Sequence, residues 1–271
     1  MSEQEQIIPA LERELKNRIS LRTTLSNSLT MAYRTLLLIR RTPQQLFDVT
    51  IQPIIFTVMF AFLFGGAITG SVQGYLPIII PGILVQTALT ASIATGVQLR
   101  EDMDKGVFNR FKSMPIARIA MLMGPLIADL VRYAIATSLT FVIGYLLGFR
   151  WASSAAALTS AILVIYAAWC VSWIFAFLGV IAPTAQVVSG ISNAILFPLA
   201  FLSGAFVPTK TLPGWLQDFV NVNPLTYIVS GARQLLNHGT IGSDFWLSII
   251  GSATVVIIFA PLTLRFYMRK A

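Results

Sequence analysis

The sequence has very few residues that could form a disulfide or hold a metal ion. Its 271 residues include one cysteine, Cys170, in an apolar segment, and one histidine, His238, in a polar segment. A single cysteine cannot form a disulfide or a metal cluster within one chain. We therefore expect Cys170 to be a small buried side chain and His238 to be a solvated loop residue; for His238, a ligand or proton-relay role is the alternative. No metal site is predicted.

The sequence also lacks the usual motif for holding the phosphates of ATP. A P-loop needs a glycine-rich turn ending in Gly-Lys-[Ser/Thr], and none of the five lysines here follows a glycine. The chain is therefore not expected to hydrolyse ATP by that device. A membrane-embedded enzyme would need a metal set or a nucleophile with its base, and neither is evident. We predict that the chain is not an enzyme and binds no cofactor itself.

Charged residues are scarce, at 11% of the chain, whereas 56% of the residues are hydrophobic. A soluble domain carries roughly a quarter charged residues. The apolar residues form blocks of about 20, the length that a helix rising about 1.5 Å per residue needs to cross a ~30 Å hydrocarbon layer. We predict an all-α polytopic membrane protein with six transmembrane helices. The predicted spans are Ile51–Thr69, Ile78–Gln98, Leu122–Phe149, Ala155–Ile181, Val187–Val207 and Trp246–Phe266.

The basic residues are distributed unevenly between the loops. Seven Lys or Arg precede the first predicted span, five lie between the second and third, and three lie at or beyond the end of the last. The loops on the opposite side hold only Arg150, Lys210 and Arg233. Because positive charge is retained in cytoplasmic loops, we expect both termini and the segment Arg100–Arg118 to be cytoplasmic. The net charge of +8 then reflects topology, and nucleic-acid binding is not expected.

Residues 21–42 have the pattern of an amphipathic helix. Apolar side chains recur at intervals of three or four, with arginines among them. This pattern is typical of a helix in the membrane interface with its bases toward lipid phosphates. We predict a cytoplasmic tail at 1–20, this interface helix at 21–42 and the six-span domain at 43–271. The pattern consists of Leu25, Leu29, Ala32, Leu36 and Ile39, with Arg22, Arg34, Arg40 and Arg41.

A dense group of charges interrupts the apolar sequence between the second and third spans. Acids come first, a glycine that permits a turn follows, and bases come last, before a break at Pro115. A short helix over about 100–115 would have one apolar edge, formed by Phe108 and Phe111. We interpret this segment as a docking surface for a soluble partner, and an ordinary solvated loop is the alternative. Its charged residues and glycine are Glu101, Asp102, Asp104, Lys105, Gly106, Arg110 and Lys112.

Asp129 and Arg132 lie three residues apart within the third apolar block, and so on one face of a helix. Ionisable residues within a span suggest a functional site. However, Tyr133–Phe149 alone, at seventeen residues, is about 25 Å of helix, which nearly crosses the hydrocarbon layer. We therefore favour a structural ion pair near the membrane surface over an ion or proton site.

The segment Pro208–Arg233 is too apolar for a free loop and too broken by proline and glycine to span. Such segments lie in the interface or re-enter the membrane as short helices covered by protein. We predict a re-entrant segment over about 208–233, with Trp215 and Tyr227 at headgroup level. Its marker residues are Pro213, Trp215, Asn223 and Pro224.

Two groups of motifs resemble the ABC-2 type transporter permeases, most closely the daunorubicin-resistance-like drug-efflux branch. The first comprises Asp104-Lys105-Gly106, Arg110 and Ser113-Met114-Pro115-Ile116. The second comprises Phe201-Leu202-Ser203-Gly204, Pro208, Leu212-Pro213, Trp215-Leu216, Asn223-Pro224-Leu225-Thr226-Tyr227 and Arg233. The resemblance extends to Arg40, Pro43, Gln52-Pro53 and Phe64-Gly65-Gly66, and so covers nearly the whole chain.

The resemblance implies a subunit of a larger complex in a bacterial cell membrane. Family members pair as two six-span subunits, as a homodimer or a heterodimer, with two ATPase subunits that bind ATP and Mg. The interface helix and the charged segment, called the coupling helix, dock on the ATPase. The residues so implicated are Glu101, Asp102, Asp104, Lys105, Gly106, Arg110, Arg34 and Arg40.

The family resemblance also implies a substrate path at the seam between the two permease subunits, lined by spans one, two and five. For each of these residues, plain helix packing is the alternative. The candidates are Phe60, Phe64, Gln86, Asn193, Phe197 and Phe201.

The leading functional hypothesis is therefore an exporter permease for an amphiphilic or hydrophobic compound. The alternative within the same class is export of a lipid-linked polysaccharide or a teichoic-acid-type polymer. An ion-driven secondary carrier is the hypothesis from a different class, but it would need intramembrane acids beyond Asp129, and the sequence shows none.

Overall fold

The computed structural model describes residues 21–41, 43–106, 118–207 and 213–270, and within these ranges every regular element is an α-helix. The all-α prediction is therefore confirmed for the described residues. The helices are α2 (Leu21–Arg41), α3 (Pro43–Thr69), α4 (Val72–Asp104), α6 (Arg118–Leu146), α7 (Ser154–Ile181), α8 (Ala185–Phe201), α9 (Gly214–Val222), α10 (Pro224–His238) and α11 (Ser243–Lys270).

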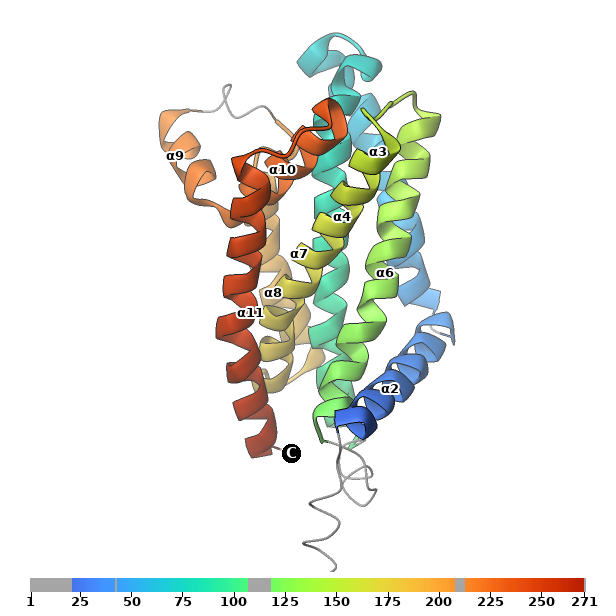
Figure 1. Ribbon diagram of the computed structural model, residues 1–271, viewed down its shortest axis with the longest axis vertical. Coiled ribbons are helices and arrows are strands. Elements are labelled where there is room, and N and C mark those ends of the chain that lie inside the picture. The colour runs from blue at the N-terminus through green and yellow to red at the C-terminus, as the bar shows by residue number, and fades with distance from the viewer. Residues whose placement is uncertain (1–20, 42, 107–117, 208–212, 271) are drawn as a thin grey trace, which may run out of the picture.

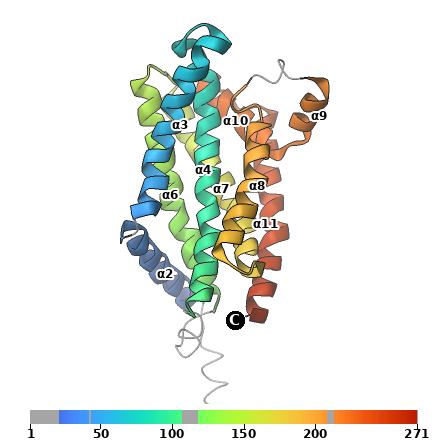
Figure 2. The same ribbon diagram turned by 180° about the vertical axis from the view of Figure 1, so that it is seen from behind.

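The long helices run along one axis and form a bundle (Figure 1). Helix α2 lies across one end, where α11 also ends, and we call this the α2 end. Helices α9 and α10 lie at the opposite end, the α10 end; Figure 2 shows the same arrangement from behind. The predicted topology places the α2 end in the cytoplasm and the α10 end outside.

Five described helices are long and apolar enough to cross a membrane: Thr50–Thr69, Val72–Asp104, Ile119–Leu146, Ser154–Ile181 and Ser243–Arg269. The fifth predicted span, Val187–Val207, is only partly helical. Helix α8 has 17 residues, about 25 Å at 1.5 Å per residue. The chain then turns through Gly204, whose φ of +67° suits glycine. The count of six spans stays a prediction.

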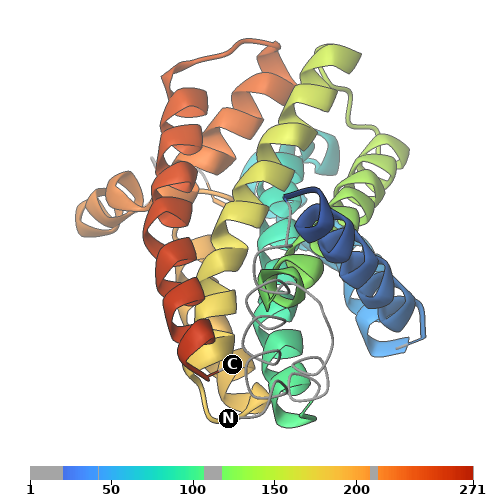
Figure 3. The same cartoon turned by 60° about the horizontal axis from the view of Figure 1, so that its bottom comes forward.

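Helix α4 is the central element of the bundle. It packs against α3, α6, α7, α8 and α10, and residues 79–89 are all buried. Figure 3, which brings the α2 end forward, shows α7 running between α4 and α11. The pattern of small and hydroxylated residues in the second span favours an interior helix, and the burial of α4 agrees with this expectation.

Glycines bring α4 and α7 into backbone contact. A Cβ atom on Gly96 would collide with the backbone of Phe175, and one on Gly179 would collide with the backbone of Gly96. Small residues that let two backbones approach closely are a common means of helix association in lipid. The contact between α4 and α7 therefore has no room for side chains at these two positions.

A buried ion pair within α6 forms hydrogen bonds to α4. Arg132 Nη1 lies 2.8 Å from Asp129 Oδ1, and the two side chains are 2% and 1% exposed. Helix α4 completes the network, because Thr95 donates a hydrogen bond to Asp129 and Gln98 Oε1 accepts one from Arg132 at 3.3 Å. The expected pairing is thus present, and protein side chains surround it.

Helix α10 is held to the rest of the bundle by hydrogen bonds to backbone carbonyls. Arg233 Nη2 donates to the carbonyls of Ile78 and Gly204, at 3.1 and 2.8 Å. Asn237 Nδ2 donates to the carbonyl of Pro77 at 2.9 Å. The α10 end of α4 is therefore tied to α10 at two successive positions.

We expect the variant Gly96→Val to lower the midpoint of thermal unfolding of the detergent-solubilised protein. The new side chain must separate α4 from α7, and overpacking of this kind costs about 1–3 kcal/mol. The matched control is Gly190→Val in α8, where an added Cβ meets nothing within 4 Å. Equal midpoints for the two variants would contradict the role assigned to the glycine contact.

We expect Asp129→Asn and Arg132→Met each to lower the unfolding midpoint markedly, since removing one partner of a buried ion pair costs about 3–5 kcal/mol. The double variant Asp129→Asn/Arg132→Met leaves no uncompensated charge and should be more stable than either single variant. The same thermal assay measures all three. If both single variants unfold at the same midpoint as the wild type, the ion pair does not stabilise the fold as inferred.

Candidate functional site

The end of α4 carries a cluster of charges whose members pair with one another. Arg100 Nε lies 2.9 Å from Asp104 Oδ1, with a second contact to the same oxygen from Nη2. Lys105 Nζ lies 2.9 Å from Glu101 Oε2. Both pairs have the i, i+4 spacing that supports a helix. Gly106, with φ +64°, ends the helix.

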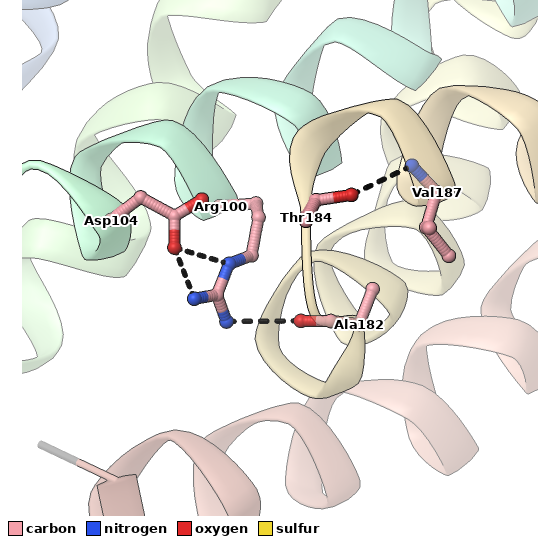
Figure 4. A network of polar contacts seen from close by, with 5 residues as sticks. All are labelled: Arg100, Asp104, Ala182, Thr184 and Val187. Atoms are coloured by element: carbon pink, nitrogen blue, oxygen red, sulfur yellow. Dashed lines mark hydrogen bonds and ion pairs between the residues drawn. The ribbon is translucent and has the colours of Figure 1, made fainter.

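Arg100 also joins α4 to the turn between α7 and α8 (Figure 4). Its Nη1 donates a hydrogen bond to the carbonyl oxygen of Ala182 at 2.9 Å. Two residues later, Thr184 caps α8, its Oγ1 accepting from the backbone N–H of Val187 at 3.3 Å. One guanidinium thus links the last turn of α4 to the turn that joins α7 to α8.

A third contact joins this cluster to α2. Arg34 Nη2 lies 3.6 Å from Asp102 Oδ1, and the Asp102 side chain is mostly buried. Helix α2 itself packs on α6, where Met31 and Ala32 are buried against Gly124. Leu25 and Leu29 are exposed. The ends of α2, α4 and α6 therefore form one unit.

The structure brings together most of the residues predicted to contact a partner. Glu101, Asp102, Asp104, Lys105 and Gly106 lie within the last turn of α4 and its cap, and Arg34 is adjacent. Arg110 and the side chain of Arg40 lie outside the described residues, as does the rest of the predicted coupling helix, residues 107–115. Arg100 was not among the predicted contacts, although its i, i+4 spacing to Asp104 was visible in the sequence.

Six phenylalanines form a second feature, which we call the phenylalanine ladder. Phe56, Phe60 and Phe64 stack along α3 with ring centroids 5.8 and 5.4 Å apart. Phe206 and Phe201 continue the series, with centroid distances of 4.7 Å from Phe60 to Phe206 and from Phe206 to Phe201. Phe197 follows one turn along α8, 6.2 Å from Phe201.

The ladder contains four of the six predicted path residues. Phe60 is buried at its centre, whereas Phe64, Phe197 and Phe201 are exposed. It also contains two phenylalanines that the sequence argument missed. Phe56 could have been found from its spacing of four to Phe60, but Phe206 follows the end of α8 and no periodicity identifies it.

The other two predicted path residues, Gln86 and Asn193, make local contacts. Gln86 is buried in α4, where its Nε2 donates to Thr90 Oγ1 at 3.4 Å and its Oε1 has no hydrogen-bond partner. Asn193 Nδ2 donates to the carbonyl of Ser189 at 2.9 Å.

The described part of the predicted re-entrant segment, from residue 213 on, contains α9 and the first part of α10, with a polar residue at their junction. Asn223 caps α10, accepting from the N–H of Leu225 at 3.0 Å, while its Nδ2 donates to the carbonyls of Leu199 and Leu202 at the end of α8. Pro224 occupies the first turn of α10, where its missing N–H is not needed. Pro213 precedes α9, and Trp215 is exposed.

No metal centre is evident in the part of the chain that the structure describes. No group of three or more His, Cys, Asp or Glu side chains there could hold an ion. Cys170, within α7, is buried and unpaired with another cysteine. The features that stand out chemically are therefore the charged end of α4 and the phenylalanine ladder.

Comparison with known proteins gives several relatives that match most of this chain. A daunorubicin resistance ABC transporter permease protein, DrrB1 of Streptomyces coeruleorubidus, is 41% identical over 252 residues, covering 92% of this chain and 88% of that protein. A putative transport permease, ycf38 of Cyanophora paradoxa, is 27% identical, covering 83% and 81%. A probable doxorubicin resistance ABC transporter permease protein, DrrC of Mycobacterium tuberculosis, is 25% identical, covering 80% and 79%.

A family described as ABC-2 type transporter matches residues 27–237. This range begins in α2 and ends in α10, so it includes both the charged end of α4 and the phenylalanine ladder. The match agrees with the resemblance drawn from the sequence motifs. This chain belongs to the ABC-2 type transporter family.

Proposed function

We propose that this chain is the membrane-spanning permease subunit of an ABC exporter that moves an amphiphilic or hydrophobic compound out of the cytoplasm or inner leaflet. A separate ATPase subunit supplies the energy and binds the ATP and Mg. The observation that carries the proposal is the construction of α4. One unbroken helix of 33 residues has the charged cluster at one end and packs along its length against α3 and α8, which bear most of the ladder.

The charged end of α4 is the proposed docking surface for the ATPase. Its exposed members are Lys105, Glu101 and Asp104, and Lys105 is 66% exposed. Exposed ion pairs contribute little to stability, so these side chains can rearrange when a partner binds. We include Arg40 and Arg110 in the same proposed docking surface.

The contacts behind this surface suggest how movement would be transmitted. Arg34 ties the surface to α2, and Arg100 ties it to the turn before α8. A partner that displaces the end of α4 would therefore displace α2 and the start of α8 with it. Because α8 carries Phe197 and Phe201, the movement caused by closure of the ATPase would be transmitted to the ladder.

The phenylalanine ladder is the proposed contact for the exported compound. Its exposed rings offer flat apolar faces to a neighbouring molecule, and aromatic rings attract one another beyond the effect of buried area. The name of the relative that is 41% identical includes daunorubicin, so a compound with fused aromatic rings is the first candidate. In the assembled exporter, a second permease subunit would face the ladder and close the path.

We expect opposite-charge substitutions at Arg34 and Asp102 to uncouple the permease from its ATPase. Arg34→Asp and Asp102→Arg alone should each reduce drug-stimulated ATP hydrolysis several-fold, because like charges would then separate α2 from α4. The double exchange Arg34→Asp/Asp102→Arg restores the attraction and should recover most of the stimulation. The measurement is nucleotide hydrolysis in liposomes that hold the chain with its ATPase.

The matched control is Arg150→Asp, a single charge reversal at the α10 end, which should leave drug-stimulated hydrolysis unchanged. If drug-stimulated hydrolysis is as low in the double exchange as in the single variants, the attraction between residues 34 and 102 is not what couples the permease to its ATPase. If neither single variant differs from the wild type, the contact does not take part in coupling.

We expect Phe201→Ala to weaken transport of daunorubicin several-fold without loss of folded protein, because the exposed Phe201 ring contributes aromatic surface and little core packing. The assay is accumulation of the fluorescent drug in inside-out vesicles. Ile191→Ala, an exposed position on the same helix outside the ladder, is the control. A reduction in both variants, or in neither, would argue against the ladder as the path.

A further inference from the structure

A cavity of about 360 Å³ lies between α7, α8, α10 and α11. Its volume is within the range of pockets that hold small molecules, about 300–1,000 Å³. Its walls are almost entirely apolar, with Phe175, Leu196, Leu199, Leu225 and Ile228 among them. Its chemistry therefore suits a hydrocarbon ligand.

The cavity extends from the protein core to the outer surface of the bundle. Phe175, at 2% exposed, and Ile228, at 3%, line its inner part, whereas Ile250 and Val222 are 61% and 81% exposed. Ile250 belongs to α11, a candidate membrane span of which little is buried by the protein. In the membrane, lipid tails rather than water would contact this opening.

The space in the cavity is a consequence of the sequence of α11. A Cβ atom added to Gly251 would meet nothing within 4 Å, although a glycine within a helix is less favourable than an alanine. Ser252, next to it, also lines the cavity. It is 4% exposed, and its Oγ has no hydrogen-bond partner. A larger apolar residue at Gly251 would fill space that the wild-type chain leaves open.

The cavity is separate from the phenylalanine ladder. On α8, Leu196 and Leu199 line the cavity, whereas Phe197 and Phe201 form the ladder. At 3.6 residues per turn these two pairs lie on different faces of one helix. The cavity is therefore distinct from the proposed path of the exported compound.

Helix α9 connects the cavity to the membrane surface. Trp215, Phe219 and Val222 are exposed and recur at intervals of four and three, so they form one apolar stripe on a short helix. Val222 belongs to both this stripe and the cavity wall. Tryptophan is enriched at the level of lipid headgroups. A lipid beside α9 would have its tail directed toward the cavity opening.

We propose that this cavity binds one hydrocarbon chain of a membrane lipid, from the leaflet at the α10 end. The predicted topology makes this the outer leaflet. The chain fills the space beside Gly251, between α8 and α11, and its headgroup lies beside the apolar stripe of α9. This site is independent of the proposed export path.

The test uses a diazirine-bearing aliphatic amino acid at Leu196, a buried wall position, in the full chain reconstituted with its ATPase. The vesicles contain palmitoyl-oleoyl phosphatidylglycerol and phosphatidylethanolamine. After illumination, mass spectrometry of the peptide should show an adduct with the mass of a phospholipid. The same probe at Leu84, which is also buried but lies in α4 outside the cavity, should yield only links within the protein.

The variant Gly251→Leu should reduce the lipid adduct at Leu196 at least several-fold, because the new side chain occupies the cavity. Gly66→Leu is the matched control, since Gly66 also has open space around it and lies on α3, away from the cavity. Equal unfolding midpoints for the two variants would establish that Gly251→Leu folds.

Three other results would overturn the proposal. Links from Leu196 to protein alone would mean that no lipid enters the cavity. A link to a second copy of the chain would make this face an interface between subunits. A lipid adduct at Leu196 that daunorubicin displaces would assign the cavity to the export path.

Discussion

The backbone contact between α4 and α7 is the constraint on which the rest of the bundle depends. Lipid tails are as apolar as the helix surfaces, so helices in a membrane associate through close packing and hydrogen bonds. Gly96 and Gly179 provide the close packing. The carbonyls of Pro77 and Ile78, near the other end of α4, accept hydrogen bonds from α10. The remaining helices pack around this fixed pair.

Charged side chains then determine which helices would move together. The buried pair of Asp129 and Arg132 on α6 is hydrogen-bonded to Thr95 and Gln98 of α4. Removal of either partner would leave a buried charge without its partner. Arg34 adds α2 to the same unit, and Arg100 adds the turn before α8. The α2 end therefore behaves as one body. In contrast, α11 has few buried residues and borders the cavity.

Patterns local in sequence were predicted well, and contacts between distant segments were not. Blocks of apolar residues identified five helices long enough to span, and a spacing of three identified the pair of Asp129 and Arg132. The end of α8 was placed six residues too late, because Leu202–Val207 is apolar enough to continue a helix but turns at Gly204. The contacts of Arg100 with Ala182 and of Phe60 with Phe206 join segments far apart in the chain. The spacing of residues within one segment gives no information about such contacts.

The acids at the end of α4 already have basic partners within the chain. A lysine or arginine of the proposed ATPase would therefore compete with Lys105 for Glu101, or with Arg100 for Asp104. Docking then exchanges ion pairs, and the displaced Lys105 or Arg100 becomes available to an acid of the other protein. Dissolved salt screens exposed pairs in the free and the bound states alike. To the extent that docking only exchanges one ion pair for another, the affinity of the proposed complex should vary little with ionic strength.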